Sequence, residues 1–129
     1  MKYWYTKEVN LTFEEALDEV TLCLAEQGFG VMSKIDVQSA MFNKLWREVE
    51  PYMILWACNP SLAYDALQEE DEIGLVMPCN VIVYKKNDKV FVSAILAAVG
   101  TSFVENEKVS EIAKKAEEKL IEALDSMLA

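Results

Sequence analysis

The spacing of hydrophobic residues along this chain switches repeatedly between the period of a strand and that of a helix. Short apolar or alternating runs at 3–9, 29–35 and 52–58 predict strands. Between the first two runs, Phe13, Ala16, Leu17, Val20 and Leu24 recur at helical spacing, which predicts an amphipathic helix. The first half of the chain therefore alternates strand and helix.

Capping residues mark where these helices begin and end. Thr12 followed by Glu15 forms a capping-box pattern at the start of the first helix, and Gly28 is suited to end it in a left-handed conformation. Asp36 predicts the start of a second helix that runs to about Glu50, where Pro51 would stop it. Asn59 followed by Pro60 predicts a third helix, over residues 60–68.

The second half of the chain predicts mainly strands before a final helix. Residues 75–77 suggest a short strand or loop that Pro78 interrupts, and 80–85 with 89–96 predict a hairpin that turns at Asn87-Asp88. Ser102 and Glu105 form a second capping-box pattern before the last helix. Its buried stripe comprises Val109, Ile112, Ala113, Ala116, Leu120, Ala123, Leu124 and Met127.

The predicted order of elements is βαβαβαβββα. This order favours an α+β two-layer sandwich with a mostly antiparallel or mixed sheet and the helices packed on one face. A small doubly wound parallel sheet is the alternative, but the closing hairpin and the lack of a Gly-rich loop after the first strand weigh against it. With 129 residues and no linker, the chain is expected to form a single domain over 1–129.

Charge narrows the possible partners. The formal net charge is −10 and Arg47 is the one arginine, so the sequence has no basic patch for nucleic acid or an anionic membrane surface. Residues 1–7 lack the apolar core of a secretory signal, and the longest apolar stretch, 90–99, is too short to span a bilayer. The expectation is a cytoplasmic protein.

The chain contains three cysteines and no histidine. In a reducing compartment, free thiols are expected rather than a disulfide framework, and catalysis by a cysteine-histidine pair is excluded. Cys58 ends a predicted strand directly before a helix, where the helix dipole favours a thiolate and an anion. It is interpreted either as a nucleophile, redox thiol or anion ligand, or as a small buried residue at the end of a strand.

A second cysteine lies in a similar setting twenty-one positions later. Cys79 follows the strand-breaking Pro78 and precedes Asn80, which either satisfies local backbone groups or points into a site. If Cys58 and Cys79 lie at one end of the sheet, they permit a disulfide switch or a two-sulfur metal site. The metal alternative is disfavoured because the remaining cysteine, Cys23, falls within a helix. No cofactor is specified by the sequence.

Aromatic residues near these motifs have two interpretations. Trp46, Trp56, Tyr52 and Tyr64 either line an apolar pocket or belong to the core. Aromatic residues at helical and strand spacing are more often core residues.

Taken together, the motifs resemble a family of small bacterial and archaeal proteins known as domain of unknown function 302. The resemblance covers nearly the whole chain, and its most specific part is the Cys-Asn-Pro motif followed by a Pro-Cys pair. It implies a compact α+β domain that tends to form homodimers. Ala97-Ala98 stands where the family often has Asp-Pro, which lowers the expectation of enzymatic activity. The residues that carry the resemblance are Gly28-Phe29, Ile35-Asp36-Val37, Cys58-Asn59-Pro60, Ala63, Ile73-Gly74, Pro78-Cys79-Asn80 and Val83.

The sequence therefore favours a homodimeric domain that binds a small molecule or an anion, rather than an enzyme. The expected binding residues are Cys58, Asn59, Pro60, Pro78, Cys79 and Asn80. Two alternatives remain: a thiol-disulfide redox protein that uses Cys58 and Cys79, and a purely structural dimerisation module.

Overall fold

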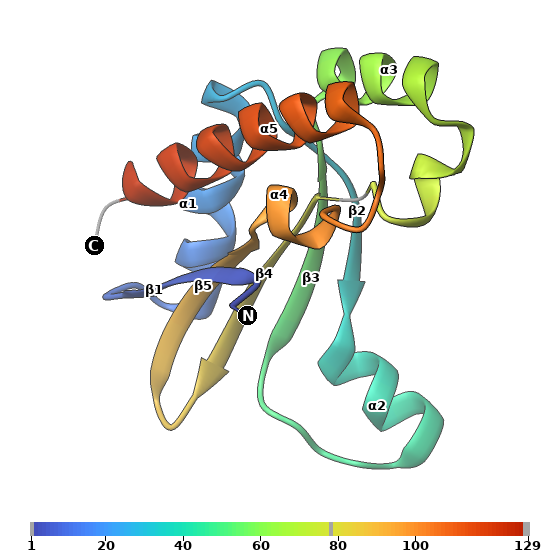
Figure 1. Cartoon of the computed structure of the whole chain (residues 1–129). Coiled ribbons are helices and arrows are strands. Elements are labelled where there is room, and N and C mark those ends of the chain that lie inside the picture. Colours follow the sequence, from blue (N-terminus) through green and yellow to red (C-terminus); the bar gives the residue numbers. More distant parts are fainter. Residues whose placement is uncertain (1, 78, 128–129) are drawn as a thin grey trace.

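A five-stranded antiparallel sheet forms the centre of the fold in a computed structural model that describes residues 2–77 and 79–127 (Figure 1). The strand order is β1-β5-β4-β3-β2, and every neighbouring pair is antiparallel. The α+β prediction is confirmed, and the parallel doubly wound alternative is wrong. The strands are β1 (Trp4–Val9), β2 (Gly30–Asp36), β3 (Tyr52–Cys58), β4 (Cys79–Lys86) and β5 (Lys89–Ile95).

Helices pack on one face of this sheet, as the sequence predicts. α1 and α5 contact each other and β5, and α3 packs beside α5 at one end of the sheet (Figure 1). The helices are α1 (Phe13–Glu26), α2 (Val37–Leu45), α3 (Pro60–Glu69), the 3₁₀ helix η1 (Asp71–Leu75), α4 (Ala97–Gly100) and α5 (Glu107–Asp125).

The core lies between this face and the helices because alternate strand residues point inward. Leu55 of β3, Val81 and Val83 of β4 and Val92 of β5 are fully buried there against Leu120 of α5. The stripe predicted for the last helix is confirmed, with Ile112 half-buried and its other members buried. We call the opposite side of the sheet the outer face.

The predicted caps of α1 and the hairpin turn are present. Thr12 Oγ1 accepts a hydrogen bond from Glu15 N at 3.1 Å, and Glu15 Oε1 accepts one from Thr12 N at 2.9 Å. Gly28 follows α1 with φ +85°, the left-handed conformation expected of it. Asn87 and Asp88 both have positive φ, as a two-residue hairpin turn requires.

Three sequence predictions are wrong in detail. α2 ends at Leu45, where Trp46 adopts a left-handed conformation with φ 56°, and does not continue to Glu50. The last helix is capped by Asn106, whose Oδ1 accepts from Lys108 N and Val109 N; Ser102 instead donates to Val99 O. Of the two alternatives for residues 75–77, the strand is wrong: Leu75 ends η1, and Val76 and Met77 form the loop.

The connection between β2 and β3 projects away from the rest of the chain (Figure 1). We call residues 37–50, which comprise α2 and the segment after it, the arm. Every residue from Met41 to Glu50 is exposed. Within the described part of the chain, α2 contributes no buried residue to the core.

Candidate functional site

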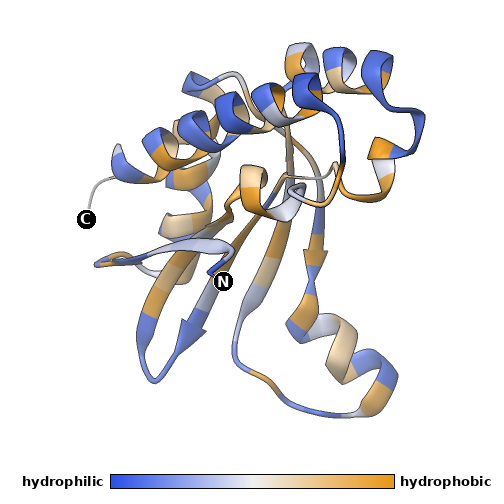
Figure 2. Cartoon of the chain, in the orientation of Figure 1, coloured by the Kyte–Doolittle hydropathy of each residue, from blue (hydrophilic) through white to orange (hydrophobic). Residues whose placement is uncertain are grey.

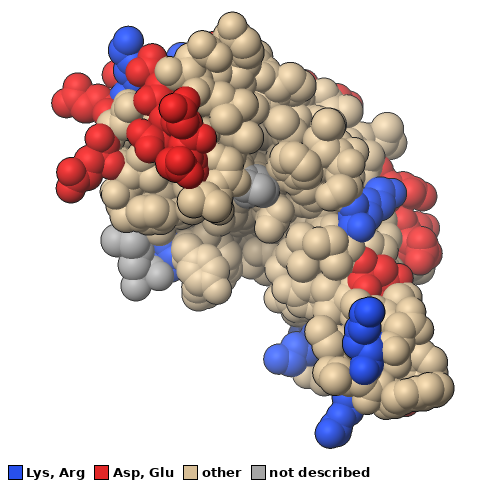
Figure 3. All heavy atoms as spheres, turned by 90° about the vertical axis from the view of Figure 1, so that its right-hand side faces the viewer, with Lys and Arg blue, Asp and Glu red and all other residues tan. Residues whose placement is uncertain are grey.

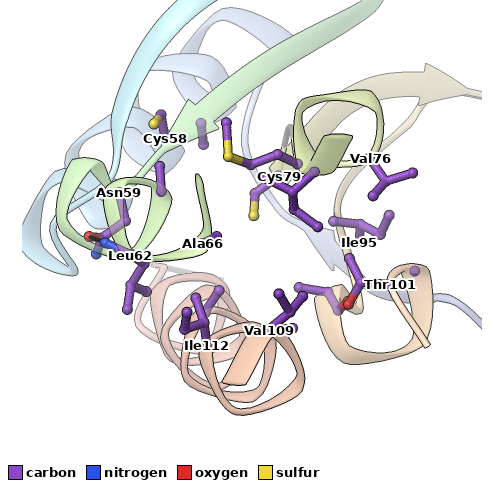
Figure 4. Close-up of a pocket in the computed structure, with 18 of the residues that line it drawn as sticks. Cys58, Asn59, Leu62, Ala66, Val76, Cys79, Ile95, Thr101, Val109 and Ile112 are labelled. Carbon is purple, nitrogen blue, oxygen red and sulfur yellow. Dashed lines mark hydrogen bonds between the residues drawn. The ribbon is translucent and has the colours of Figure 1, made fainter. Parts of the chain in front are cut away.

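A cavity of about 70 Å³ lies at the end of the sheet where β3 ends and β4 begins. α3 bounds one side and α4 the other, and α5 forms its floor (Figure 4). About 10–15 Å³ of such volume holds one water molecule, so this space is equivalent to roughly five waters. The cavity opens partly to solvent.

The lining of the cavity is almost entirely hydrophobic. It includes Phe29, Leu62, Ala66, Ile73, Val76, Met77, Ile95, Ala97, Val109, Ile112, Ala113 and Ala116. Among the described residues, none that lines it is charged. The residues around it that carry a polar side-chain group are Trp56, Cys58, Asn59, Cys79 and Thr101.

Cys79 opens β4 and lines the cavity between α4 and the end of β3. It is the register partner of Ala57, so the Pro-Cys and Cys-Asn-Pro motifs lie on adjacent strands. Burial, with a smaller contribution from the nearby charge of Cys58, raises the pKa of the Cys79 thiol to about 11. Cys79 is therefore a neutral thiol at pH 7.

Cys58 follows Ala57, and neighbouring residues in a strand point to opposite faces. Its side chain accordingly diverges from that of Cys79, and both thiols are free (Figure 4). Burial also raises the pKa of Cys58, although it directly precedes α3.

Asn59 connects three parts of the site. Its Oδ1 accepts from Leu62 N at 3.2 Å, which caps α3, and its Nδ2 donates to Gln27 O at 3.4 Å. A Cβ atom at Gly28 would lie 3.0 Å from this Nδ2, so glycine leaves room for the amide. The side chain of Asn59 is thus engaged within the protein, and its role is to join α1 to α3.

Two other predicted site residues, Pro60 and Asn80, lie outside the cavity. Pro60 is the exposed first residue of α3, and Asn80 is exposed on the outer face opposite Trp56. Neither lines the cavity. Pro78 lies outside the described residues.

Of the four aromatic residues considered in the sequence, one lines the cavity and three do not. Trp56 lines the cavity, whereas Trp46 and Tyr64 are exposed and take no part in it. Tyr52 lies on the outer face, stacked against Tyr84 with ring centroids 5.5 Å apart. A common aromatic pocket does not form among these four residues.

Sequence reasoning missed the part of the lining that comes from the last third of the chain. α4 and Thr101 follow the hairpin, and Val109 and Ile112 belong to the α5 stripe. The sequence marks these α5 residues only as buried. Which buried residues surround empty space depends on how α3, α4 and α5 pack.

No metal centre is formed by the described residues. Across 2–77 and 79–127, no three cysteine or carboxylate side chains converge on a point where a metal ion would bind. In the same ranges, no helix is long and apolar enough to cross a membrane.

Fold and cavity together define a class: an α+β protein whose antiparallel sheet and helices enclose a small apolar cavity at one sheet end. A family model described as "Domain of unknown function DUF302" matches residues 5–127. The chain therefore belongs to the DUF302 family, as the sequence motifs predict.

A solved structure has the same fold. It is titled "Crystal structure of uncharacterized conserved protein DUF302 from Bacillus stearothermophilus" and aligns with a TM-score of 0.91 at 26% sequence identity. The alignment covers 97% of this chain and 98% of that one. No curated protein matches this chain.

Proposed function

We propose that this protein binds a small, uncharged and largely apolar molecule, or the apolar end of a larger one, in the cavity beside Cys79. The observation that carries this proposal is a cavity of about 70 Å³ with a hydrophobic lining and no charged residue among the described ones. Apolar cavities bind apolar ligands because water inside them lacks hydrogen-bond partners. The Cys79 thiol and Thr101 Oγ1, which donates to Ala97 O at 2.8 Å and retains its acceptor capacity, are polar groups that could orient a ligand.

An anionic ligand receives less support. The first turn of α3 would be the natural anion site, but Asn59 already accepts from Leu62 N and Pro60 has no N–H to donate. No lysine or arginine lines the cavity within the described chain.

The redox alternative also receives less support. A redox pair needs at least one thiol with a lowered pKa and two sulfurs within bonding distance. Burial instead raises the pKa of both Cys58 and Cys79, and their side chains diverge.

The test is a titration of the protein with benzene and with 1-hexanol, monitored by the methyl NMR signals of Ile73, Val109 and Ile112. We expect these signals to shift while methyl groups in the rest of the core do not. Inorganic phosphate, titrated in parallel, is expected to shift none of them; an effect of phosphate at the start of α3 would favour the anion alternative.

A matched pair of variants assigns the effect to the cavity. Ala113→Leu places a larger side chain in the cavity and should abolish the shifts, whereas Lys114→Leu adds the same side chain to the exposed side of α5. If neither probe shifts the methyl signals of the native protein at millimolar concentration, the binding proposal is wrong.

We also propose that the protein is a cytoplasmic homodimer and that the chain folds as a single domain. The cysteines Cys23, Cys58 and Cys79 are all free, as is usual in a reducing compartment, and this supports the cytoplasm. The exposed hydrophobic residues of the arm support self-association. Sedimentation equilibrium from 1 to 100 μM protein tests the dimer, since a constant monomer mass would contradict it.

A further inference from the structure

The arm is longer than the sheet requires. β2 and β3 are adjacent antiparallel strands, and such strands are ordinarily joined by two to five residues. Here the connection runs from Val37 to Pro51. Its helix, α2, has nine residues, which is shorter than the roughly 12–15 that a helix needs to be even marginally stable in isolation. Packing against another surface would stabilise it.

The arm and the adjoining strand β2 expose several large hydrophobic side chains. Hydrophobic and hydrophilic residues are interspersed along α2 (Figure 2). Trp46 is 81% exposed, and its ring contacts Phe42 edge to face with centroids 5.5 Å apart. The full group is Met32, Ile35, Met41, Phe42, Leu45, Trp46 and Val49, with exposures between 37% and 81%.

The size of this surface matches one side of a stable interface. At roughly 200 Å² for each fully exposed side chain, which is the size of an aromatic residue, the seven residues together expose at most about 750 Å². One partner contributes about 800 Å² to a standard protein interface. Crystal-packing contacts and transient complexes bury a smaller area.

A second uncovered surface lies at the same end of the sheet. On the outer face, Tyr52, Tyr84 and Phe91 form a row across β3, β4 and β5, with ring centroids 5.5 and 5.2 Å apart. All three side chains are only partly buried. We call these three residues the aromatic row. The arm directly precedes Tyr52 in the chain, so both surfaces are present near one end of each copy.

The charge of the arm allows a second copy of this acidic chain to be the partner. Although the net charge is −10, the arm contains Lys44 and Arg47 against Glu48 and Glu50, and is therefore neutral. In Figure 3, the lobe that contains α2 carries Lys and Arg side chains, whereas Asp and Glu side chains gather at the upper left and along the right edge next to that lobe. Two identical acidic chains repel each other least where their surfaces carry no net charge.

We propose that the arm of one copy packs on the aromatic row of a second copy and that the reciprocal contact forms about a twofold axis. This inference rests on the proposed homodimer and assigns its interface. Trp46 is the central contact residue, because exposed tryptophans that become buried dominate interface energies. The twofold axis makes each contact occur twice.

The experiment compares single variants with their mixture by sedimentation equilibrium. Trp46→Glu removes the arm contact and Phe91→Lys removes the row contact, so each variant alone should be monomeric. In a dimer of either variant, both arm-row contacts carry the substitution. We therefore expect the dissociation constant of each variant's dimer to rise roughly 1,000-fold. Leu22→Glu is the control: Leu22 is 64% exposed on α1, which packs with α5 and lies away from α2 (Figure 1), and its replacement should leave the dimer unchanged.

Mixing the two variants tests the geometry itself. In a mixed dimer, the intact arm of the Phe91→Lys chain meets the intact row of the Trp46→Glu chain, and the second contact places the new glutamate near the new lysine. We expect the mixture to form dimers that neither variant forms alone. Far-ultraviolet circular dichroism and thermal melts of each variant confirm that it is folded, and Tyr84→Lys replaces Phe91→Lys if the latter is not.

Each contrary outcome has a separate meaning. A Trp46→Glu protein that remains dimeric would overturn the assigned interface and leave the homodimer proposal standing. Variants that are monomeric alone and also when mixed would overturn the packing of arm on row. A native chain that is monomeric up to 100 μM would overturn both the interface and the homodimer.

Discussion

At the scale of single residues, the signature motif of this chain holds secondary structures together. Asn59 caps α3 through its carbonyl oxygen and binds the end of α1 through its amide nitrogen. Gly28 leaves the space that this amide occupies. The motif therefore positions Cys58, before the cap, and Leu62, after it, at the wall of the cavity.

Replacing Asn59 by Ala should lower the free energy of unfolding by about 1–2 kcal/mol, because both the cap and the bond to Gln27 are lost. Asn59→Asp retains the cap and loses only the donor, so its loss should be smaller. Urea denaturation measures both. Equal losses for the two variants would show that the cap contributes little.

The thiol of Cys79 should make the stability depend on pH in the alkaline range. Its pKa is about 11 in the folded protein, whereas a free thiol has a pKa near 8.5. As the pH rises above about 8.5, the unfolded chain loses this proton first. The thiol's contribution to stability is therefore complete below that pH and is lost as the pH approaches 11.

We expect this loss to be at most about 2–3 kcal/mol, because Cys79 is not completely buried. Urea denaturation at several pH values between 8 and 11 measures it. Cys79→Ala is the control, since it should lack this part of the pH dependence. Parallel curves for the two proteins would contradict the high pKa.

At the scale of elements, the chain separates into parts that build the sheet and a part that the sheet does not use. α1, α3 and α5 each bury apolar residues, whereas every residue from Met41 to Glu50 in the arm is exposed. The strands on either side of the arm pair along their length, apart from a bulge between Val31 and Ser33. The fold of one chain should therefore not depend on the arm.

Replacing residues 38–50 by Asn-Gly should leave a folded protein, because a short turn suffices to join β2 to β3. We expect a cooperative thermal transition and the same methyl NMR shifts with benzene as in the native protein. Circular dichroism and the benzene titration measure these properties. An unfolded product would show that the arm stabilises the single chain.

The elements that the sequence predicts best are those with a local signal. Thr12 and Glu15 mark the start of α1, Asn59 and Pro60 that of α3, and Asn87-Asp88 the hairpin turn, all of which the structure contains. Each of these signals depends on hydrogen bonds or backbone angles within a few residues.

The errors arise where local signals compete. Ser102 and Glu105 have the spacing of a capping box, but Asn106 caps α5 because its Oδ1 accepts two backbone N–H groups. Pro51 marks where a helix has to stop, not where it does stop, and the left-handed Trp46 ends α2 earlier. Cys58, Asn59 and Cys79, which the sequence singles out, lie at the sheet end that contains the cavity. Its apolar character was not predicted because much of the lining comes from α4 and α5.

At the scale of the whole molecule, the net charge of −10 opposes association of identical copies. The neutral arm removes this repulsion only at the contact itself. Acidic side chains around the contact still repel each other, because charges up to about 10 Å apart interact at 0.1 M salt. Salt should therefore strengthen the dimer.

Raising sodium chloride from 20 to 300 mM should lower the dissociation constant of the dimer several-fold, as repulsion between the two acidic chains is screened. Sedimentation equilibrium at both salt concentrations measures the change. A dimer weakened by salt would indicate that ion pairs, rather than the apolar arm, hold the copies together.

The sheet order also constrains how the chain acquires its structure. β1 is the first strand of the chain, but its pairing partner is β5, with Trp4 opposite Ile95 and Val9 opposite Val90. A ribosome makes the first strand long before the segment that completes its hydrogen bonds, and loop closure over such a separation is slow. The nascent chain thus carries β1 unpaired until about three quarters of the protein has been synthesised. Chaperones would matter most to this protein during that period.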